Sequence, residues 1–300
     1  MKKMSILAYS LIAVAVFLLA GAFSTAAAEK PINENCKAAP DGRVEISNLG
    51  GSVVVTGWDR PEVAVTGTLG PGAERLDFEC GEGRTRIEVV NAKIVKNEIE
   101  SDLKVSLPKG SAIRIETVTA GIEVSSVSGA LELESVSGDI RISGNLRDVE
   151  ARSTSGEIET SGSASKVEAE SVSGTITLQG VKQEARASNV SGDIHVAGGR
   201  MKEGEFESVS GDIHFDGDLE PSGRLNAKSV SGAIELLLPA AISAEFKVST
   251  FSGKVENDFR VEAEKEGRRD AGKSFEFSTG GGKARIEIET FSGTMSLKKK

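Results

Sequence analysis

The two histidines of the chain are the first residues to consider for chemistry. His195 and His214 are its only histidines, and each follows the same Val-Ser-Gly-Asp-Ile run. If these runs stack, the two imidazoles lie side by side and could bind a metal ion. Two neutral ligands bind a metal weakly, however, and arginine, glutamate and threonine occupy the same position in other runs. We therefore predict no metal site and no cofactor, with this histidine pair as the one alternative.

Acids and serines recur around the same runs. Asp139, Asp193 and Asp212 follow the glycine of a run, but the chain lacks the glycine-rich nonapeptide of calcium-binding β-rolls, so we expect solvated turn acids. The serines lack the Gly-x-Ser-x-Gly elbow that presents a nucleophile. Carboxylate pairs that cleave polysaccharides remain an alternative because the chain has 45 acids. It has only one tryptophan and one tyrosine to stack on sugars. We therefore predict no catalytic residues.

One repeated run must position all of these side chains. Its clearest copy is Ser135-Val-Ser-Gly-Asp-Ile140, and from Gly138 to Gly253 the glycines of successive copies are 18, 18, 18, 19, 21 and 21 residues apart. A fixed period of this kind is typical of solenoids. We expect the glycines to supply a turn conformation that a Cβ atom would penalise. The predicted turn glycines are Gly129, Gly138, Gly156, Gly174, Gly192, Gly211, Gly232, Gly253 and Gly293.

Each repeat contains two short alternating strands, such as residues 139–143 and 148–152. In an antiparallel meander, like residues of successive repeats would lie two strands apart. In a wound solenoid they stack directly, about 4.8 Å apart. Strict repetition favours direct stacking, so the sequence predicts an all-β fold, a narrow parallel β-solenoid or β-helix with coils of about 18–21 residues, capped at both ends. In the first full coil, we expect an inward core of Ile140, Ile142, Val149 and Ala151, with Val136 filling a corner.

The N-terminal residues suggest export, and the rest of the chain suggests a single domain. Residues 1–28 resemble a signal peptide, with Lys2 and Lys3, an apolar run and small residues before a cleavage point. A retained membrane anchor is the alternative. We expect no transmembrane segment after cleavage. The predicted organisation is a lead at 29–42 and one solenoid domain at 43–297, with regular repeats at 117–259 and irregular caps at 70–116 and 260–297.

The charge and the cysteine content limit which partners and which cellular compartment we expect. The net charge is −9, and it becomes −11 if Lys2 and Lys3 are removed with the signal peptide. Only 298–300 form a basic cluster, so we predict no nucleic-acid partner. Cys36 and Cys80 are the only cysteines. In an exported chain such a pair predicts a disulfide, with two free thiols as the alternative.

Several motifs together resemble a known family. They are the opening Gly51-Ser-Val-Val-Val-Thr-Gly-Trp-Asp-Arg-Pro-Glu-Val63, the run Asp102-Leu-Lys-Val-Ser-Leu-Pro-Lys-Gly110 followed by Ile113-Arg-Ile115, and the serial Ser-Val-Ser-Gly-Asp-Ile copies. Over residues 43–297 the chain resembles the bacterial "putative adhesin" family of exported β-solenoid proteins of unknown function. The resemblance implies the fold and the compartment, and it brings no catalytic residues.

The leading functional prediction is therefore a non-enzymatic, adhesin-like protein of the periplasm or cell surface. Its stacked side chains would bind a protein or a glycan of the cell envelope. A polysaccharide-acting β-helix enzyme and a purely structural envelope spacer are the alternatives. The sequence does not indicate the oligomeric state.

Overall fold

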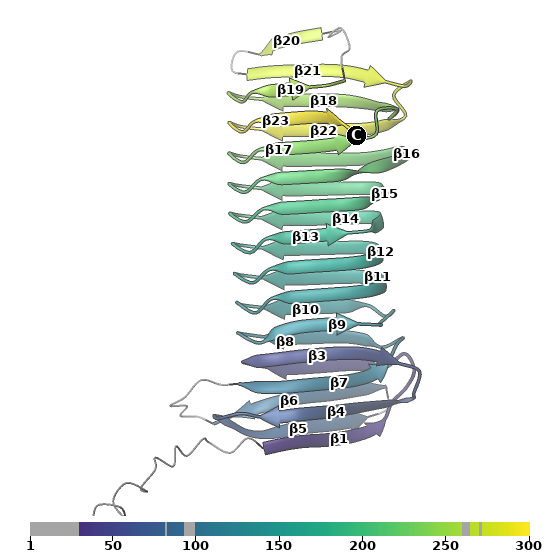
Figure 1. Cartoon of the computed structure of the whole chain (residues 1–300), viewed down its shortest axis with the longest axis vertical. Coiled ribbons are helices and arrows are strands. Elements are labelled where there is room, and N and C mark those ends of the chain that lie inside the picture. The colour runs from purple at the N-terminus through teal and green to yellow at the C-terminus, as the bar shows by residue number, and fades with distance from the viewer. Residues whose placement is uncertain (1–29, 82, 93–99, 260–264, 270–271) are drawn as a thin grey trace, which may run out of the picture.

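The computed structural model describes residues 30–81, 83–92, 100–259, 265–269 and 272–300. The signal peptide expected at 1–28 lies outside these residues. Within them the secondary structure consists of 23 strands and no helix, which confirms the all-β class. The strands form a long, narrow, β-solenoid-like stack with the N-terminal strands at one end (Figure 1).

The strands form because apolar and polar residues alternate along them. In β11 (Ile140–Ser153) the side chains of Ile140, Ile142, Val149 and Ala151 are all buried, as expected. The strand continues around one edge of the stack and thus contributes to two faces. It turns near Gly144, which has a φ of +126° that most other residues would avoid.

The middle of the stack keeps a parallel register that places like residues next to each other. Ile140 of β11 lies beside Ile158 of β12 (Ile158–Ser171), and Ile158 lies beside Ile176 of the next strand. The same register carries on to Ile194 and Ile213. Because each strand pairs with neighbours above and below, the backbone hydrogen bonds of the inner strands are satisfied between turns of the chain.

The strands form two faces. The A face begins at the N-terminal end of the stack and contains, in spatial order, β1 (Lys30–Lys37), β4 (Glu62–Leu69), β7 (Ser101–Pro108), β3 (Gly51–Trp58), β9 (Gly121–Ser125), the first parts of β11 and β12, β13 (Ile176–Gln179), the first parts of β15 (Ile194–Ser208) and β16 (Ile213–Ser229), β17 (Ile234–Leu238), β23 (Met295–Lys299) and β19 (Val255–Asn257).

The B face packs against the A face across the buried core. In the same direction it contains β5 (Ala73–Gly81), β6 (Arg84–Asn91), β2 (Arg43–Asn48), β8 (Ala112–Thr117), β10 (Leu131–Ser135), the second parts of β11 and β12, β14 (Val181–Asn189), the second parts of β15 and β16, β22 (Ala284–Thr290), β18 (Ala244–Thr250), β21 (Gly272–Thr279) and β20 (Lys265–Arg269).

Spatial order departs from chain order at both ends of the stack. The coil formed by β2 and β3 lies between β6–β7 and β8–β9. At the other end, the last coil of the chain, β22–β23, lies between β16–β17 and β18–β19 (Figure 1). Residues 284–297 therefore form an inner coil, and the expectation that all of 260–297 is a cap is wrong.

Antiparallel strands end both faces at the N-terminal end and the B face at the C-terminal end. At the N-terminal end β1 pairs with β4, and β5 pairs with β6, in antiparallel register. At the C-terminal end β21 pairs antiparallel with β18, and β20 with β21. The lead expected at 29–42 is thus partly structured, because Lys30–Lys37 forms the terminal strand of the A face. Such strands cover edges that would otherwise be free to pair with other chains.

Candidate binding surface

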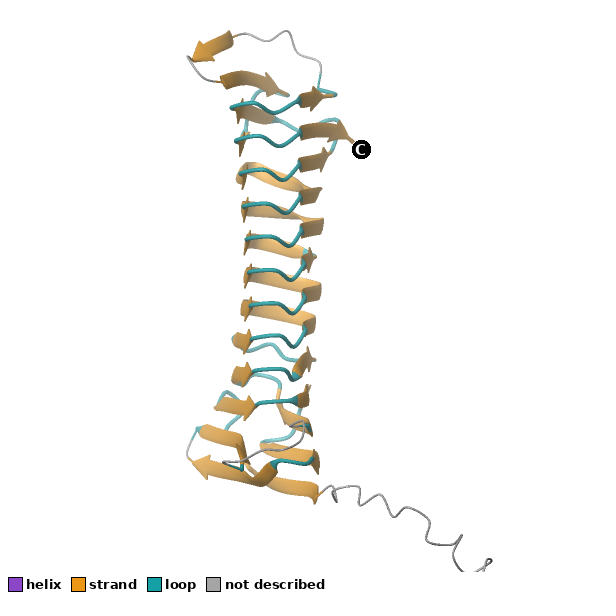
Figure 2. Cartoon of the chain, turned by 90° about the vertical axis from the view of Figure 1, so that its left-hand side faces the viewer, coloured by secondary structure: helices purple, strands orange, loops and turns teal. Residues whose placement is uncertain are grey.

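The Ser-x-Ser-Gly turns lie one above another along one edge of the stack. Figure 2 looks at this edge, where the loops form a column. Each turn is bonded to its neighbour through the backbone: the amide of Ser155 donates to the carbonyl of Val136 at 2.9 Å, and the amide of Ser173 donates to that of Thr154 at 3.0 Å. The turns therefore form a continuous edge.

The first hydroxyl of most runs has a structural role, although the buried Oγ of Ser208 has no hydrogen-bond partner among the described residues. Ser153 is buried, and its Oγ accepts a hydrogen bond from the amide of Gly156 at 2.9 Å. Asn189 replaces the serine in one run and accepts from the amides of both Ser191 and Gly192. Buried polar groups need such partners. The same hydrogen bond is made by Ser135, Ser171, Ser229, Thr250 and Thr290.

The turn glycines are required by the closeness of successive turns. A Cβ atom on Gly156 would lie 2.2 Å from the carbonyl oxygen of Gly138, and one on Gly174 would lie 2.0 Å from that of Gly156. None of the nine predicted glycines has a positive φ, so the expected conformational reason is wrong. Gly129 also differs in place: it stacks on Ser111, between β9 and β10 on the opposite edge.

On this edge the second residue of each run points into solvent. Val136 was expected in a corner of the core, but it is 48% exposed. The cause is that it stands at the tip of the turn, beyond the strands that enclose the core. The equivalent residues of the other runs on this edge are exposed too, whereas Val127, in the run of Gly129 on the opposite edge, is buried. We call this column the turn ridge; in stack order it consists of Leu49, Val118, Val136, Thr154, Val172, Val190, Val209, Val230, Phe291 and Phe251.

The turn ridge is almost entirely apolar. Thr154 is its one polar member. At its C-terminal end the rings of Phe251 and Phe291 stack at a centroid distance of 4.7 Å, although they are 40 residues apart in the chain. The ten positions span about 43 Å at the usual strand spacing. Single exposed apolar residues are common on protein surfaces, whereas a continuous apolar patch marks an interaction site.

A shallow groove of about 790 Å³ runs beside the N-terminal half of the turn ridge. One wall is the ridge from Leu49 to Val172, and the other is formed by outward side chains of the B face, including Glu116, Glu134 and Glu170. The buried hydroxyl residues Ser135 and Ser153 lie at its floor. The groove thus combines an apolar wall with a charged one.

Acidic residues flank the turn ridge on the A face as well. Asp139 accepts a hydrogen bond from the amide of Glu157 at 3.1 Å, and Asp193 and Asp212 each accept one from the next turn, at 2.9 and 2.7 Å. These aspartates were expected to be solvated. In the structure they also connect successive turns, because each carboxylate accepts a hydrogen bond from a backbone amide of the next turn.

The B face carries ladders of paired charges. Arg152 contacts Glu170, with Nε and Oε2 3.1 Å apart, and it also contacts Glu150 and Glu134. Lys228 contacts Glu207 at 3.1 Å. The side chains of these pairs are 39–49% exposed, so water screens their charges and each pair contributes little to stability.

The structure brings the two histidines together on the A face. The ring centroids of His195 and His214 are 6.1 Å apart, and Nδ1 of His214 lies 3.5 Å from Glu235. The hydrogen bond that Lys298 donates to Glu235 lowers the pKa of that carboxyl, and the neighbouring His214 acts in the same direction. In the part of the chain that the structure describes, no three metal-ligating side chains converge.

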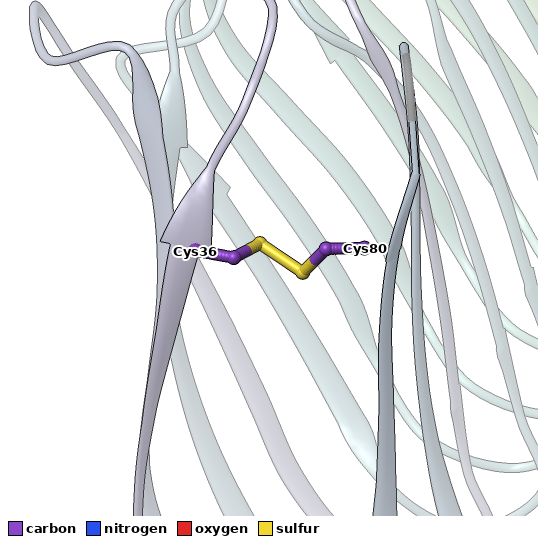
Figure 3. The surroundings of a disulfide bond; sticks show 2 residues. All are labelled: Cys36 and Cys80. Atoms are coloured by element: carbon purple, nitrogen blue, oxygen red, sulfur yellow. A yellow bond between two sulfur atoms is a disulfide. The ribbon is translucent and has the colours of Figure 1, made fainter.

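The predicted disulfide is present at the N-terminal end (Figure 3). It joins Cys36 of β1 to Cys80 of β5. These strands belong to opposite faces, so the bond connects the two faces at the end of the stack. Among residues 30–300, in so far as they are described, no helix is long and apolar enough to cross a membrane.

The stacked architecture places the chain in the class of β-solenoid-like proteins. More specifically, it belongs to the Toastrack DUF4097 family, whose profile matches residues 41–189 and 99–298. No curated protein matches the sequence.

Solved structures with low sequence identity match most of the chain. A "putative adhesin" from Bacteroides fragilis is 12% identical, with 90% of this chain and 98% of that chain covered and a TM-score of 0.45. A "putative adhesin" from Parabacteroides distasonis is 18% identical, with 89% and 97% covered and a TM-score of 0.39. A "putative lipid binding protein" from the same species is 16% identical, with 90% and 97% covered and a TM-score of 0.41.

Proposed function

We propose that this chain is a non-enzymatic, adhesin-like binding protein of the cell envelope, exported to the periplasm or cell surface. In this proposal it is a narrow parallel β-solenoid with coils of about 18–21 residues, which presents stacked side chains to a protein or glycan. The observation that carries the proposal is the turn ridge, a continuous line of exposed apolar side chains.

Two further features support the proposal. The disulfide between Cys36 and Cys80 fits an exported protein, because disulfides persist in oxidising compartments. Many acids of the B face are held in ion pairs, such as Glu170 with Arg152 and Glu207 with Lys228. Carboxylates engaged in this way are poorly placed for the acid and base steps of polysaccharide cleavage.

The proposal can be tested by measuring binding of the labelled protein to cells and isolated envelopes of its source. A variant with Val136→Thr, Val172→Thr and Val190→Thr removes the apolar character of the turn ridge and keeps its shape. A control with Thr56→Ser and Thr177→Ser changes outward residues of the A face away from the ridge instead. We expect saturable binding that the ridge variant loses and the control keeps. Protease or glycan-degrading treatment of the envelopes identifies the partner class.

Two outcomes would overturn the proposal. Equal binding by the ridge variant and the control would show that the turn ridge is not the binding surface. If no preparation binds the protein saturably, the chain acts as a spacer.

A further inference from the structure

We infer that the turn ridge binds a cationic amphipathic α-helix of a partner polypeptide, which lies lengthwise along the stack. This inference rests on the proposed function, since it names the class of partner for the same surface. It follows from three properties of the ridge. They are the spacing of its apolar side chains, the charge on both of its flanks, and the fact that the turn forms equally well with a polar side chain at the ridge position.

The spacing of the ridge fits a helix better than an extended strand. Ridge side chains follow each other at the strand separation of about 4.8 Å. One helical turn rises about 5.4 Å, so the apolar stripe of a helix runs ahead of the ridge by only about 0.6 Å per contact. Side chains on one face of a strand are about 6.7 Å apart, and they lose register with the ridge after two or three contacts.

The flanks of the ridge select a basic partner. On the B face the outward residues nearest the ridge include Glu116, Glu134, Glu170, Glu207 and Glu289. On the A face the residues directly after the turn include Asp139, Glu157, Asp193 and Asp212. Helices with lysine or arginine beside their apolar stripe would place positive charge against both rows.

Basic residues along the ridge cancel only part of this acidity. Arg152 and Lys228 contact Glu170 and Glu207 of the same B-face row, and Lys254 stands in the A-face row. The nine acids of the two rows therefore exceed the three bases by six. A second copy of this chain would bring acidic flanks against acidic flanks, and an anionic lipid surface would be repelled in the same way. Charge complementarity therefore favours the cationic helix over both.

The apolar side chains are not needed to build the turn. Thr154 occupies a ridge position, and its carbonyl accepts the amide of Ser173 at 3.0 Å, as the carbonyl of Val136 accepts that of Ser155 at 2.9 Å. Threonine has nearly the shape of valine with a hydroxyl in place of one methyl group. A Val→Thr change at the ridge should therefore keep the stack and weaken only an apolar contact.

The test uses the purified protein and two synthetic helices of about 21 residues, or three heptads. Both carry leucine at positions a and d; one carries lysine at e and g, and the other carries glutamate there. Binding is measured by fluorescence anisotropy at low and high salt. We expect saturable one-to-one binding of the lysine peptide that weakens as salt rises, and no binding of the glutamate peptide.

Variants locate the binding on the ridge. The Val136→Thr, Val172→Thr and Val190→Thr variant should weaken binding of the lysine peptide at least about tenfold, because half-exposed valines lose an apolar contact. Replacing Glu134 and Glu170 by glutamine should weaken it at least about threefold. The matched control changes Glu123 and Glu159, exposed A-face acids away from the ridge, to glutamine and should leave binding unchanged. Circular dichroism and thermal unfolding confirm that each variant stays folded.

Four results would overturn the inference. They are equal binding of the glutamate peptide, unchanged binding of the lysine peptide to the ridge variant, ridge-dependent binding to lipid vesicles without the peptide, and ridge-dependent self-association in sedimentation. If binding to envelopes depends on the ridge while the lysine peptide fails, the helical partner is wrong and the proposed function stands.

Discussion

At the scale of single residues, backbone proximity decides which side chains the turns accept. The turn glycines have ordinary φ angles, but the carbonyl oxygen of the neighbouring turn occupies the space of a Cβ atom. The buried hydroxyl of Ser171 accepts the amide of Gly174 at 3.0 Å. A typical turn therefore combines one buried hydrogen-bond acceptor, one glycine and one exposed apolar residue.

Replacing Gly174 by alanine should lower the free energy of unfolding by about 3 kcal/mol or more, because overpacking typically costs 1–3 kcal/mol and the obstructing atoms here are backbone. The added Cβ would lie 2.0 Å from the carbonyl oxygen of Gly156. Urea unfolding monitored by circular dichroism measures the change.

Gly121 provides the matched control within the stack. A Cβ atom there would have its nearest neighbour 3.9 Å away, and its φ is not positive, so alanine should cost less than about 1 kcal/mol. A similar loss in both variants would show that close stacking is not why the turns contain glycine.

At the scale of elements, the N-terminal end depends on strands that are far apart in the chain. β1 is the last strand of the A face and β5 is the last strand of the B face. Each is paired on one side only within the described residues, so the hydrogen-bonded ladders hold them less firmly than they hold the inner strands. The disulfide between Cys36 and Cys80 compensates by joining the two.

Replacing both cysteines by serine should lower the free energy of unfolding by about 4 kcal/mol on the chain-entropy model, for a loop with a sequence separation of 44. Urea unfolding of the variant and of the reduced wild-type protein should agree. A loss below about 1 kcal/mol would mean that the unfolded chain is hardly restricted by the bond or that the native bond is strained.

At the scale of the whole molecule, the last coil of the chain completes an inner part of the stack. β22 separates β16 from β18, and β23 separates β17 from β19. The preceding coil, 244–257, therefore cannot form its native strand pairs until β22 and β23, at the end of the chain, have folded onto the stack. Local order in the C-terminal region depends on the last residues.

A chain truncated after residue 283 should lose protection against hydrogen exchange throughout 244–257, because β18 and β19 lose their inner partners. A control truncated after residue 298 keeps most of this pairing and should retain the protection. If the shorter chain keeps slow exchange at 244–257, the outer coil can pair directly with β16–β17, and the last coil is dispensable.

Much of the architecture could be predicted from the sequence. Alternation around Ile140 and Ile142 identified the buried side, the repeat identified stacked copies, and export with two cysteines indicated the bond between Cys36 and Cys80. The candidate surface was harder to predict. Val136 is apolar, so it was assigned to the core; the available signal was Thr154, a polar residue at the same position of another run.

The sequence by itself determined the strands, the stacking of like residues and the acidic character of the surface, because alternation, period and charge are properties of residues close together in the chain. Only the tertiary structure decided the order of the coils, the outward direction of the turn valines and the closeness that excludes a Cβ atom. These depend on contacts between distant segments: Phe251 meets Phe291, and Leu49 lies beside Val118, only after the chain has inserted one coil between two others.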